Sequence, residues 1–427
     1  MPQSIVVYID RVPVALKVGG SMAGLMHGLQ LKREGNDVTI LEREPISERS
    51  SHEAGVGFRT SVEEFLRRFD ETGLTSAFTS DDLQFAYRRR ANIFASKMKY
   101  KLTSWGLLYR ILRANFDGFA STACPQPPPS RKEDGNATYL AGRQVTDIQY
   151  ADGIVTVHYS DVTSGKAGSV TADLVIGADG VHSIVRELVK APMVKQYAGY
   201  VAWRGTVPEK FLSKATLDYF TNGLSFNLMR RTYIVCYVIP TDAGVFEPGE
   251  RLVNWVWYYN VAEDSPEIAE ILTGTDGKLR KNTVSSGLVN PQVWDRVRAA
   301  VDPRMAAPFA ELLGKTDQPF VTKVNDAICS APRHCDGRVV LVGDALTTIR
   351  PHTALATEQA ARHCLLLGKA RKGEISMEDW DHEVCVYARR MLLLSRLVGE
   401  LGQGSTWMFL KSVYRYLMFM IRLKLGG

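Results

Sequence analysis

The sequence has few cysteines, and they are too scattered for two common ways of stabilising a protein. Six cysteines are spread over 427 residues, without the paired spacing of a zinc site and without the density of a disulfide framework. We therefore expect no metal site, and this use of cysteine favours a reducing, cytoplasmic environment. The N-terminus lacks a basic region followed by a long apolar core, so no signal peptide is expected.

Long apolar runs and strong charge asymmetry are missing as well. No stretch of about twenty uncharged apolar residues occurs, so no bilayer-spanning helix is expected. The net charge of +6 is modest and both signs are interspersed, so we expect no nucleic-acid partner. The tightest basic run, residues 88–90, is interpreted as a solvated hairpin rim. With 45% apolar residues, the chain is long enough for two or three domains with large cores.

The first motif that points to a function lies near the N-terminus. An apolar run at residues 14–18 meets a turn of small residues, a helical pattern ends at Gly35, and a second apolar run, residues 38–41, stops at Glu42. This order of strand, turn, helix, strand and acid is typical of a dinucleotide-binding βαβ unit. Small residues let the backbone approach a pyrophosphate at the helix N-terminus, and the acid can accept hydrogen bonds from a ribose.

The turn of this motif departs from the usual pattern at one position. Gly-x-Gly-x-x-Gly is filled here by Gly19, Ser21 and Gly24, so serine takes the middle place. Serine is small and its hydroxyl can itself contact a phosphate, so we expect the site to tolerate the change. Lys17 is unusual in the preceding strand, because a buried lysine is costly unless it is paired.

Further strand–turn–helix units follow along the chain. The predicted elements are helices at 61–69, 105–116 and 353–367, strands at 172–176 and 338–342, and a hairpin of strands 145–150 and 154–159. The first of the two single strands leads into Asp179-Gly180 and a helix from about Ser183, and the second leads into Gly343-Asp344. The nucleotide-binding domain is therefore expected to consist of pieces that are distant in sequence.

Between these pieces the composition changes to aromatic and β-branched residues. The predicted elements there are strands at 200–207, 217–220, 233–239 and 252–259, with helices at 266–272 and 292–301. The expected fold is thus α/β, with a discontinuous Rossmann-like domain, a mainly antiparallel β-sheet domain and C-terminal helices. The expected boundaries are 1–82, 101–194 and 325–373 for the nucleotide-binding domain, 83–100 for strands that cross to the second domain, 195–324 for that domain, and 374–427 for the C-terminal helical region.

Four stretches in this order resemble one family. They are Gly19 to Gly24 with Glu42, Arg110 on its helix, residues 178–180 with Ser183 and Arg186, and Gly343-Asp344 with Pro351. Over roughly residues 14–375 the chain resembles the para-hydroxybenzoate-hydroxylase-like (class A) FAD-dependent monooxygenases. Residues 200–205, 254–258 and 350–354 look similar to the 2,6-dihydroxypyridine 3-monooxygenase-like fungal branch.

The resemblance implies a cofactor and a reaction. The nucleotide would be FAD, NAD(P)H would be a co-substrate, and the second domain would bind the substrate. The reaction implied is hydroxylation of a phenolic or hydroxy-heteroaromatic small molecule by O2 through a flavin C4a-hydroperoxide. Two alternatives are an epoxidase that acts on an olefin or isoprenoid, and a flavin-binding protein that has lost oxygenase activity.

The resemblance also implies roles for single residues. Beside the glycine turn, the resemblance implies that Glu42 contacts the adenosine ribose of FAD, that Gly55 lies close to the cofactor, and that Arg110 contacts its phosphate–ribose region. Asp179 would contact both FAD and the nicotinamide cofactor. Asp344 would contact the ribityl chain or pyrophosphate, and Pro351 to Thr357 the flavin ring. The loop after the proline departs from the family because its residues carry Cβ atoms where the family has glycine, and because it leads into Glu358. Glu358 either donates or accepts a hydrogen bond at the flavin ring or is an ordinary acid in the first turn of a helix.

Catalytic residues are harder to predict. A ring is most easily hydroxylated as its phenolate, so the site should hold an anion, and we expect Arg204 to stabilise it. His352 either relays a proton or caps the helix that faces the flavin.

The C-terminal segment, residues 405–425, has a narrow basic face and is otherwise too apolar for an ordinary surface helix. It is expected to pack against the substrate domain or a partner chain, as in a homodimer, or to lie on an anionic membrane in peripheral contact.

Overall fold

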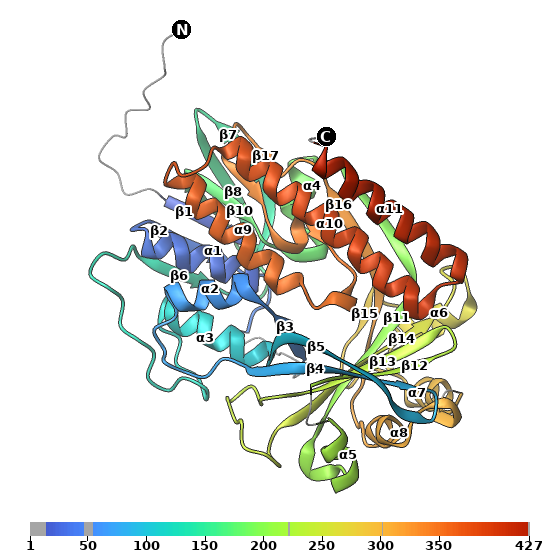
Figure 1. Cartoon of the computed structure of the whole chain (residues 1–427). Coiled ribbons are helices and arrows are strands. Elements are labelled where there is room, and N and C mark those ends of the chain that lie inside the picture. The colour runs from blue at the N-terminus through green and yellow to red at the C-terminus, as the bar shows by residue number, and fades with distance from the viewer. Residues whose placement is uncertain (1–13, 47–53, 221–222, 301, 426–427) are drawn as a thin grey trace.

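The computed structural model describes residues 14–46, 54–220, 223–300 and 302–425, and Figure 1 shows their arrangement. Pro13 and the polar segment at 47–53, both within the first predicted domain piece, lie outside these residues. Two large sheets form the body of the molecule. Helices cover both of them, and the C-terminal helices run along one side.

The first large sheet is mostly parallel. Its six strands, in spatial order, are β17 (Arg333–His334), β18 (Val339–Leu341), β10 (Leu174–Gly177), β1 (Val14–Val18), β2 (Asp37–Leu41) and β6 (Ala137–Leu140). Only β17 is antiparallel to its neighbour. The central strands are mostly apolar and largely buried, as residues Leu16, Ile40 and Val340 illustrate, although Lys17 of β1 is a buried cation. This is the predicted Rossmann-like sheet.

Helices from distant parts of the chain pack on this sheet. They are α1 (Met22–Arg33), α2 (Thr60–Phe69), α3 (Trp105–Asp117), α4 (Ile184–Leu188) and α9 (Ala356–Arg371). A separate three-stranded antiparallel sheet adjoins them, formed by β7 (Arg143–Ala151), β8 (Ile154–Asp161) and β9 (Ala167–Ala172). The predicted hairpin is present, and Asp152 and Gly153 both have positive φ, 52° and 78°, which is the geometry of a two-residue hairpin turn.

The second large sheet is mainly antiparallel, as predicted. Its strands are β15 (Thr283–Val284), β16 (Phe320–Cys329), β11 (Met193–Pro208), β14 (Leu252–Asn260), β13 (Thr232–Ile239), β12 (Leu224–Met229), β4 (Phe78–Tyr87), β5 (Arg90–Ser104) and β3 (Gly55–Phe58), with β19 (Thr347–Thr348) paired to β16. The one parallel pair among them joins β12 to β4. Helices α5 (Lys214–Phe220), α6 (Pro266–Leu272), α7 (Pro291–Ala299) and α8 (Ala307–Gly314) accompany it.

The two faces of this sheet have different environments because side chains alternate along a strand. Trp203, Trp255 and Trp257 lie on the face covered by helices, where each packs against Trp294 of α7. Tyrosines dominate the opposite face, with Tyr200, Tyr233, Tyr237 and Tyr258 in one buried cluster. The tryptophans thus fill the core between the sheet and its helices. The tyrosines line the opposite face of the sheet, which meets the remainder of the chain.

The prediction of a strand at residues 217–220 was wrong. These residues belong to helix α5, in which Thr216 and Phe220 are buried one turn apart. The Ser213 hydroxyl accepts a hydrogen bond from the backbone N–H of Thr216 at 3.4 Å. The Glu311 carboxylate accepts hydrogen bonds from the hydroxyls of Ser213 and Thr216. A four-residue apolar run does not by itself distinguish a strand from a helix.

The predicted start of helix α9 was also wrong. A short 3-10 turn, η5 (Pro351–Thr353), comes first, and Ala354 follows in the left-handed conformation at φ 51°. The helix therefore begins at Ala356 and not at Thr353. A non-glycine residue in this conformation is uncommon, and such positions cluster at functional sites.

Two long helices complete the chain. Helix α10 (Met377–Gln403) packs against α9 and η5, and α11 (Thr406–Lys424) runs back along α10 at the edge of the molecule (Figure 1). None of the helices in the described part of the chain has the length and hydropathy to cross a membrane.

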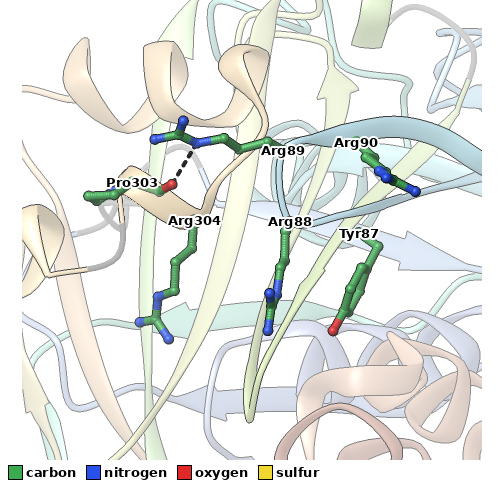
Figure 2. A pocket seen from close by; sticks show the side chains of 6 residues that line it. All are labelled: Tyr87, Arg88, Arg89, Arg90, Pro303 and Arg304. Atoms are coloured by element: carbon green, nitrogen blue, oxygen red, sulfur yellow. Dashed lines mark hydrogen bonds between the residues drawn. The ribbon is translucent and has the colours of Figure 1, made fainter.

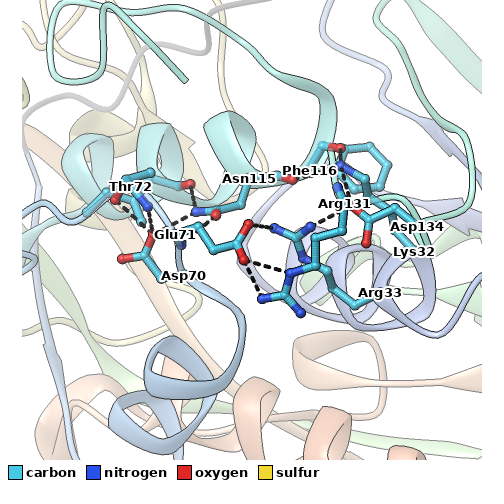
Figure 3. A network of polar contacts seen from close by, with 10 residues as sticks. Lys32, Arg33, Asp70, Glu71, Thr72, Asn115, Phe116, Arg131 and Asp134 are labelled. Atoms are coloured by element: carbon cyan, nitrogen blue, oxygen red, sulfur yellow. Dashed lines mark hydrogen bonds and ion pairs between the residues drawn. The ribbon is translucent and has the colours of Figure 1, made fainter. Parts of the chain in front are cut away.

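A polar network fixes the end of α1 and the long proline-rich loop that follows α3 (Figure 3). The Lys32 ammonium donates to the last carbonyls of α3, those of Asn115 and Phe116, at 3.0 and 2.9 Å. Arg33 bridges Asp134 of the loop, at 2.5 Å, and Glu71 beyond α2, at 2.8 Å. These contacts hold helix α1 at its C-terminus. Because the helix is rigid, they also fix the position of its N-terminus at the edge of the sheet.

Candidate functional site

Three turns meet where the parallel strands β1, β10 and β18 end. A Cβ added to Gly19, which has φ 100°, would lie 2.5 Å from the carbonyl oxygen of Ala178 in the turn after β10. A Cβ on Gly24 would lie 1.9 Å from the carbonyl oxygen of Gly19, and one on Gly343 would touch Ala23 at 3.0 Å. Glycine at the two outer positions of the motif is therefore required by close backbone contact. The carboxyl edge of such a sheet is where nucleotides bind.

Ser21 sits at the N-cap of α1 but does not cap it. Its backbone is extended, and its hydroxyl makes no capping hydrogen bond. The first turn of the helix contains no acidic residue. The backbone N–H groups of that turn and the serine hydroxyl therefore face the sheet edge as donors, which is the arrangement that binds a phosphate.

Glu42 ends β2 beside the glycine turn. Its side chain is buried, and its carboxylate accepts hydrogen bonds from the backbone N–H of Gly20 at 2.7 Å and of Glu44 at 2.9 Å. These bonds hold the acid at the position where the motif predicts a ribose contact. The observed turn, helix terminus and acid fit an adenine dinucleotide such as FAD.

The Glu42→Ala variant is expected to bind FAD and ADP about 10- to 100-fold more weakly, because a charged acceptor is lost. Riboflavin, which has no adenosine ribose, should be affected much less. Equilibrium titration followed by flavin fluorescence measures both affinities. The exposed neighbour Glu44, replaced by Ala, is the matched control. Equal weakening of FAD and riboflavin would place the ribose elsewhere.

Asp344 lies in the turn η4 (Gly343–Ala345) that follows β18. Burial raises the pKa of its carboxyl to about 6. No side chain or backbone group of the described residues donates a hydrogen bond to that carboxyl, although it keeps accessible surface. An unpartnered carboxylate deep in the protein that still meets open space is suited to hydroxyl donors of a ligand.

His363 supports this turn from helix α9, and no sequence motif pointed to this residue. Its Nδ1 accepts the backbone N–H of Gly343 at 3.1 Å. Burial lowers the pKa of His363 to about 3, so the ring is neutral and can accept this bond. The histidine therefore fixes the backbone from which Asp344 projects.

Asp179 occupies the corresponding turn after β10. One carboxylate oxygen accepts from the backbone N–H of Val185 at 3.1 Å, whereas Oδ1 is buried and has no partner in the described part of the chain. Burial raises the pKa of this carboxyl. Arg186 joins this turn to that of Asp344, because it donates to the carbonyls of Val181 at 2.9 Å and Ala345 at 2.8 Å.

Gly55 and Arg110 lie where the two large sheets approach each other. The N–H of Gly55 donates to Asn254 Oδ1 at 2.8 Å, and a Cβ at this position would lie 2.7 Å from the Tyr237 hydroxyl. Arg110 donates to the carbonyl oxygen of Asp242 at 2.7 Å and pairs with its carboxylate at 3.7 Å. Both residues thus connect the nucleotide side to the antiparallel sheet, and their contact with a cofactor stays a prediction.

The loop from Pro351 to Thr357 enters helix α9 at the same interface. Thr357 is buried in the first helical turn. Glu358 accepts backbone N–H groups from Arg59, Ser61 and Val62 at 3.0, 2.7 and 3.3 Å, so it caps the N-terminus of α2. Glu358 is thus an acid of a first helical turn, that of α9, as the second alternative expected, and its carboxylate also caps a different helix.

A histidine between two tyrosines faces the same interface. His352 Nε2 lies 2.5 Å from the Tyr200 hydroxyl, and Nδ1 is hydrogen-bonded to the Tyr233 hydroxyl. Burial, followed by the positive charges of Arg350 and Arg204, lowers the pKa of His352 well below its usual value, so the ring is neutral. We call Tyr200, His352 and Tyr233 the Tyr–His–Tyr chain.

Helix α10 closes over this chain with two glycines. A Cβ on Gly399 would lie 2.7 Å from His352 Nε2, and one on Gly402 would lie 2.3 Å from the Tyr233 ring. The sequence did not single out either glycine. Their lack of a side chain lets the helix backbone lie directly on the aromatic cluster.

A buried ion network holds α10 in this place. Asp326 of β16 is fully buried and accepts from Arg350 Nε at 2.7 Å and from Arg396 Nε and Nη2 at 2.9 and 2.6 Å. Glu400 lies 3.5 Å from Arg350. Because Arg350 directly precedes the loop of His352, the network fixes both the helix and the loop.

Arg204 lies on the same face of β11 as Tyr200. Its charge acts on Tyr237 as well as His352: burial raises the pKa of Tyr237 to about 12, and Arg204 opposes this rise. Arg204 Nε is buried and has no hydrogen-bond partner among the described residues. A guanidinium group among tyrosines, with a buried donor still available, can hold an anion.

The predicted site residues therefore form two groups. The turns with Gly19, Ser21, Gly24, Asp179 and Asp344 meet at one edge of the Rossmann-like sheet, with Glu42 beside them. Gly55, Arg110, Pro351, Thr357 and Arg204 lie toward the antiparallel sheet. Tyr233, Asn254 and His363 complete the two groups and were not predicted.

This fold and site are similar to those of the class A FAD-dependent monooxygenases. A family model described as FAD binding domain-like matches residues 197–326. The chain is 28% identical to 2,6-dihydroxypyridine 3-monooxygenase of Paenarthrobacter nicotinovorans over 352 residues, 82% of this chain and 80% of that protein. It is 23% identical to 6-hydroxynicotinate 3-monooxygenase of Pseudomonas fluorescens over 409 residues, 94% and 93% of the two chains.

Solved structures agree with these similarities. The structure of 2,6-dihydroxypyridine-3-hydroxylase from Arthrobacter nicotinovorans superposes with a TM-score of 0.77 at 25% identity, over 93% of this chain and 94% of that one. Klebsiella pneumoniae HpxO, complexed with FAD and uric acid, has the same fold, with a TM-score of 0.66 at 18% identity over 95% and 92%. The family prediction is confirmed, whereas the fungal branch stays a prediction.

Proposed function

We propose that this protein is an FAD-dependent monooxygenase that hydroxylates a phenolic or hydroxy-heteroaromatic small molecule with NAD(P)H and O2. The proposal is carried by one observation: Arg204, with a buried donor that has no partner in the described chain, lies among the tyrosines of the sheet face that meets the nucleotide-binding part. The similar proteins named above act, by their names, on dihydroxypyridine and hydroxynicotinate.

FAD, when bound, would supply the redox chemistry: two electrons from NAD(P)H reduce O2, one oxygen atom enters the substrate ring, and the other leaves as water. The protein's residues hold the two reactants and exclude water. Ser21 and Glu42 would bind the adenosine diphosphate part of FAD, and Asp344 would accept hydrogen bonds from hydroxyls of the cofactor. Ala354, in the left-handed conformation, leads into α9, and the N-terminus of that helix would stabilise negative charge on the flavin ring.

Arg204 binds the ionised hydroxyl of the substrate. A phenolate is electron-rich and attacks an electrophilic oxygen more readily than the neutral phenol, so the cation favours the reactive form. The tyrosine-lined face around it supplies apolar contact for a flat ring. Charge and shape together select a small aromatic anion.

The Tyr–His–Tyr chain holds and moves the proton that the substrate hydroxyl loses. A neutral imidazole has one N–H donor and one acceptor nitrogen, and each nitrogen of His352 is bonded to a tyrosine hydroxyl. In a concerted shift the first tyrosine would take the substrate's proton as it passes its own to His352, His352 would pass its N–H proton to the second tyrosine, and that hydroxyl would release its own proton to water beyond the chain, so no charge stays on the buried ring.

The test is the Arg204→Met variant. We expect kcat/KM for substrate-stimulated NAD(P)H oxidation to fall about 100-fold, the equivalent of losing one charged hydrogen bond, while bound FAD is retained. Lys195→Met, an exposed cation on the same strand, is the control. A panel of phenols and hydroxypyridines identifies the substrate. Unchanged turnover of the best substrate would remove Arg204 from the active site.

A further inference from the structure

We propose that the outer face of helix α11 docks on an anionic membrane surface. Besides Met408, six large apolar or aromatic side chains of this segment are between 48% and 80% exposed. They are Trp407, Leu410, Tyr414, Leu417, Ile421 and Leu425. We call these six residues the apolar stripe. No residue of α11 is fully buried.

The apolar stripe is continuous along the helix. At about 100° per residue, its six members fall within an arc of about 80°. The opposite side of α11 carries half-buried residues such as Phe409, Tyr416 and Met420, and α11 packs against α10 (Figure 1). One face therefore already has its partner inside the molecule, and the stripe faces outward.

Basic residues border the apolar stripe. Lys411, Arg415 and Arg422 occupy the adjacent arc of about 40°, and Lys424 borders the other side. All four are exposed, and no carboxylate of the described residues pairs with them. From Leu401 to the last residue the sequence contains no aspartate or glutamate. The surface is therefore apolar in the middle and purely cationic at its margins.

This combination fits a lipid surface with acidic headgroups. Apolar side chains enter the boundary between headgroups and acyl chains, and lysine and arginine stay at the phosphates. Trp407 and Tyr414 have the amphipathic rings that concentrate at membrane interfaces. A second copy of the chain fits less well, because a symmetric contact of two α11 helices would bring eight cations together without one helical carboxylate.

The experiment uses the full-length FAD-loaded protein and sedimentation with two kinds of vesicle. One is pure phosphatidylcholine, and the other contains about one third phosphatidylserine. We expect binding to the anionic vesicles, weakened by salt, and little binding to the neutral ones. L410S/L417S/I421S should abolish binding. K411Q/R415Q/R422Q should weaken it on the order of 100-fold, from three surface charges.

The control variant is R88Q/R89Q/R90Q, which removes three exposed arginines from a different surface. These arginines and Arg304 line a hollow at the β4–β5 hairpin, where Arg89 donates to the carbonyl of Pro303 at 2.7 Å (Figure 2). The control has the same loss of charge, so it separates docking by α11 from general attraction between a basic protein and an anionic surface. We expect its vesicle binding to stay within about twofold of the unaltered protein.

A second measurement reports on the stripe directly. Trp407 is 75% exposed, whereas the other six tryptophans are buried or half-buried. Acrylamide should therefore quench Trp407 most, and anionic vesicles should protect it. The W407F variant should lose the quenchable component and its protection together.

Three results would overturn the proposal. The first is that the unaltered protein ignores anionic vesicles. The second is that the arginine control loses binding as strongly as the two α11 variants. The third is concentration-dependent dimerisation in analytical ultracentrifugation that L410S/L417S/I421S abolishes, which would assign the stripe to a second copy of the chain.

Discussion

Asp344→Ala is expected to abolish stable binding of FAD while the fold is retained. The carboxyl lies deep in the protein at the turn after β18, keeps accessible surface and has no donor among the described residues. A ligand hydroxyl that donates to it forms a charge-assisted bond, whose loss costs about 1.5–3 kcal/mol, or roughly 10- to 100-fold in affinity. The flavin content of the purified protein, from its absorbance spectrum, gives the answer.

The pH dependence provides a second measurement on the same residue. Burial raises the pKa of Asp344 to about 6 in the cofactor-free protein. The hydroxyl donors require the ionised form, so binding releases a proton, and FAD affinity should fall as the pH decreases through about 6. Asp344→Asn should remove this dependence. Asp317→Ala, at an exposed acid, is the control. FAD retained near the original stoichiometry in Asp344→Ala would contradict the assignment.

Asp326→Ala should have the largest effect on stability. It removes the buried carboxylate shared by Arg350 and Arg396, so the buried Arg350 keeps only Glu400 at 3.5 Å and the partly buried Arg396 loses its partner. Removal of one member of a buried ion network typically costs about 3–5 kcal/mol, because uncompensated charge stays in the interior. The measurement is the free energy of unfolding from urea denaturation of the FAD-loaded protein.

An exposed ion pair provides the comparison for this variant. Lys214 and Asp218 pair at 2.6 Å one turn apart, with side chains 86% and 63% exposed. Asp218→Ala should therefore cost less than about 1 kcal/mol. If Asp326→Ala is no more destabilising than Asp218→Ala, the network does not hold α10 against the loop of His352.

The elements that follow a strict pattern are those that the sequence predicts well. The βαβ unit from β1 to Glu42 is local, and its hydrophobic period and glycine turn leave little choice of conformation. Short elements are different. Helix α5 is held by Glu311, 95 residues after Thr216, and the delayed start of α9 depends on the conformation of a single alanine. Neither long-range contact nor single dihedral angles are encoded in a local pattern.

The site divides in the same way. Turn residues such as Gly19 and Asp344 follow strands and are recognisable from their neighbours in the sequence. The Tyr–His–Tyr chain joins residues from β11, β13 and the loop before α9, which are 119 and 152 positions apart. His352 was identified from the sequence as a single residue, but its hydrogen bonds arise only when distant segments pack together.

The two glycines of helix α10 have a consequence for the order in which the molecule can be assembled. The nucleotide edge begins with Gly19, yet the wall over His352 and Tyr233 consists of Gly399 and Gly402. During synthesis, a nascent chain will therefore contain the complete glycine turns long before it contains that wall. Water can enter the aromatic cluster until Gly399 and Gly402 have emerged, so the active site is sealed only after every turn of the nucleotide-binding edge has been synthesised.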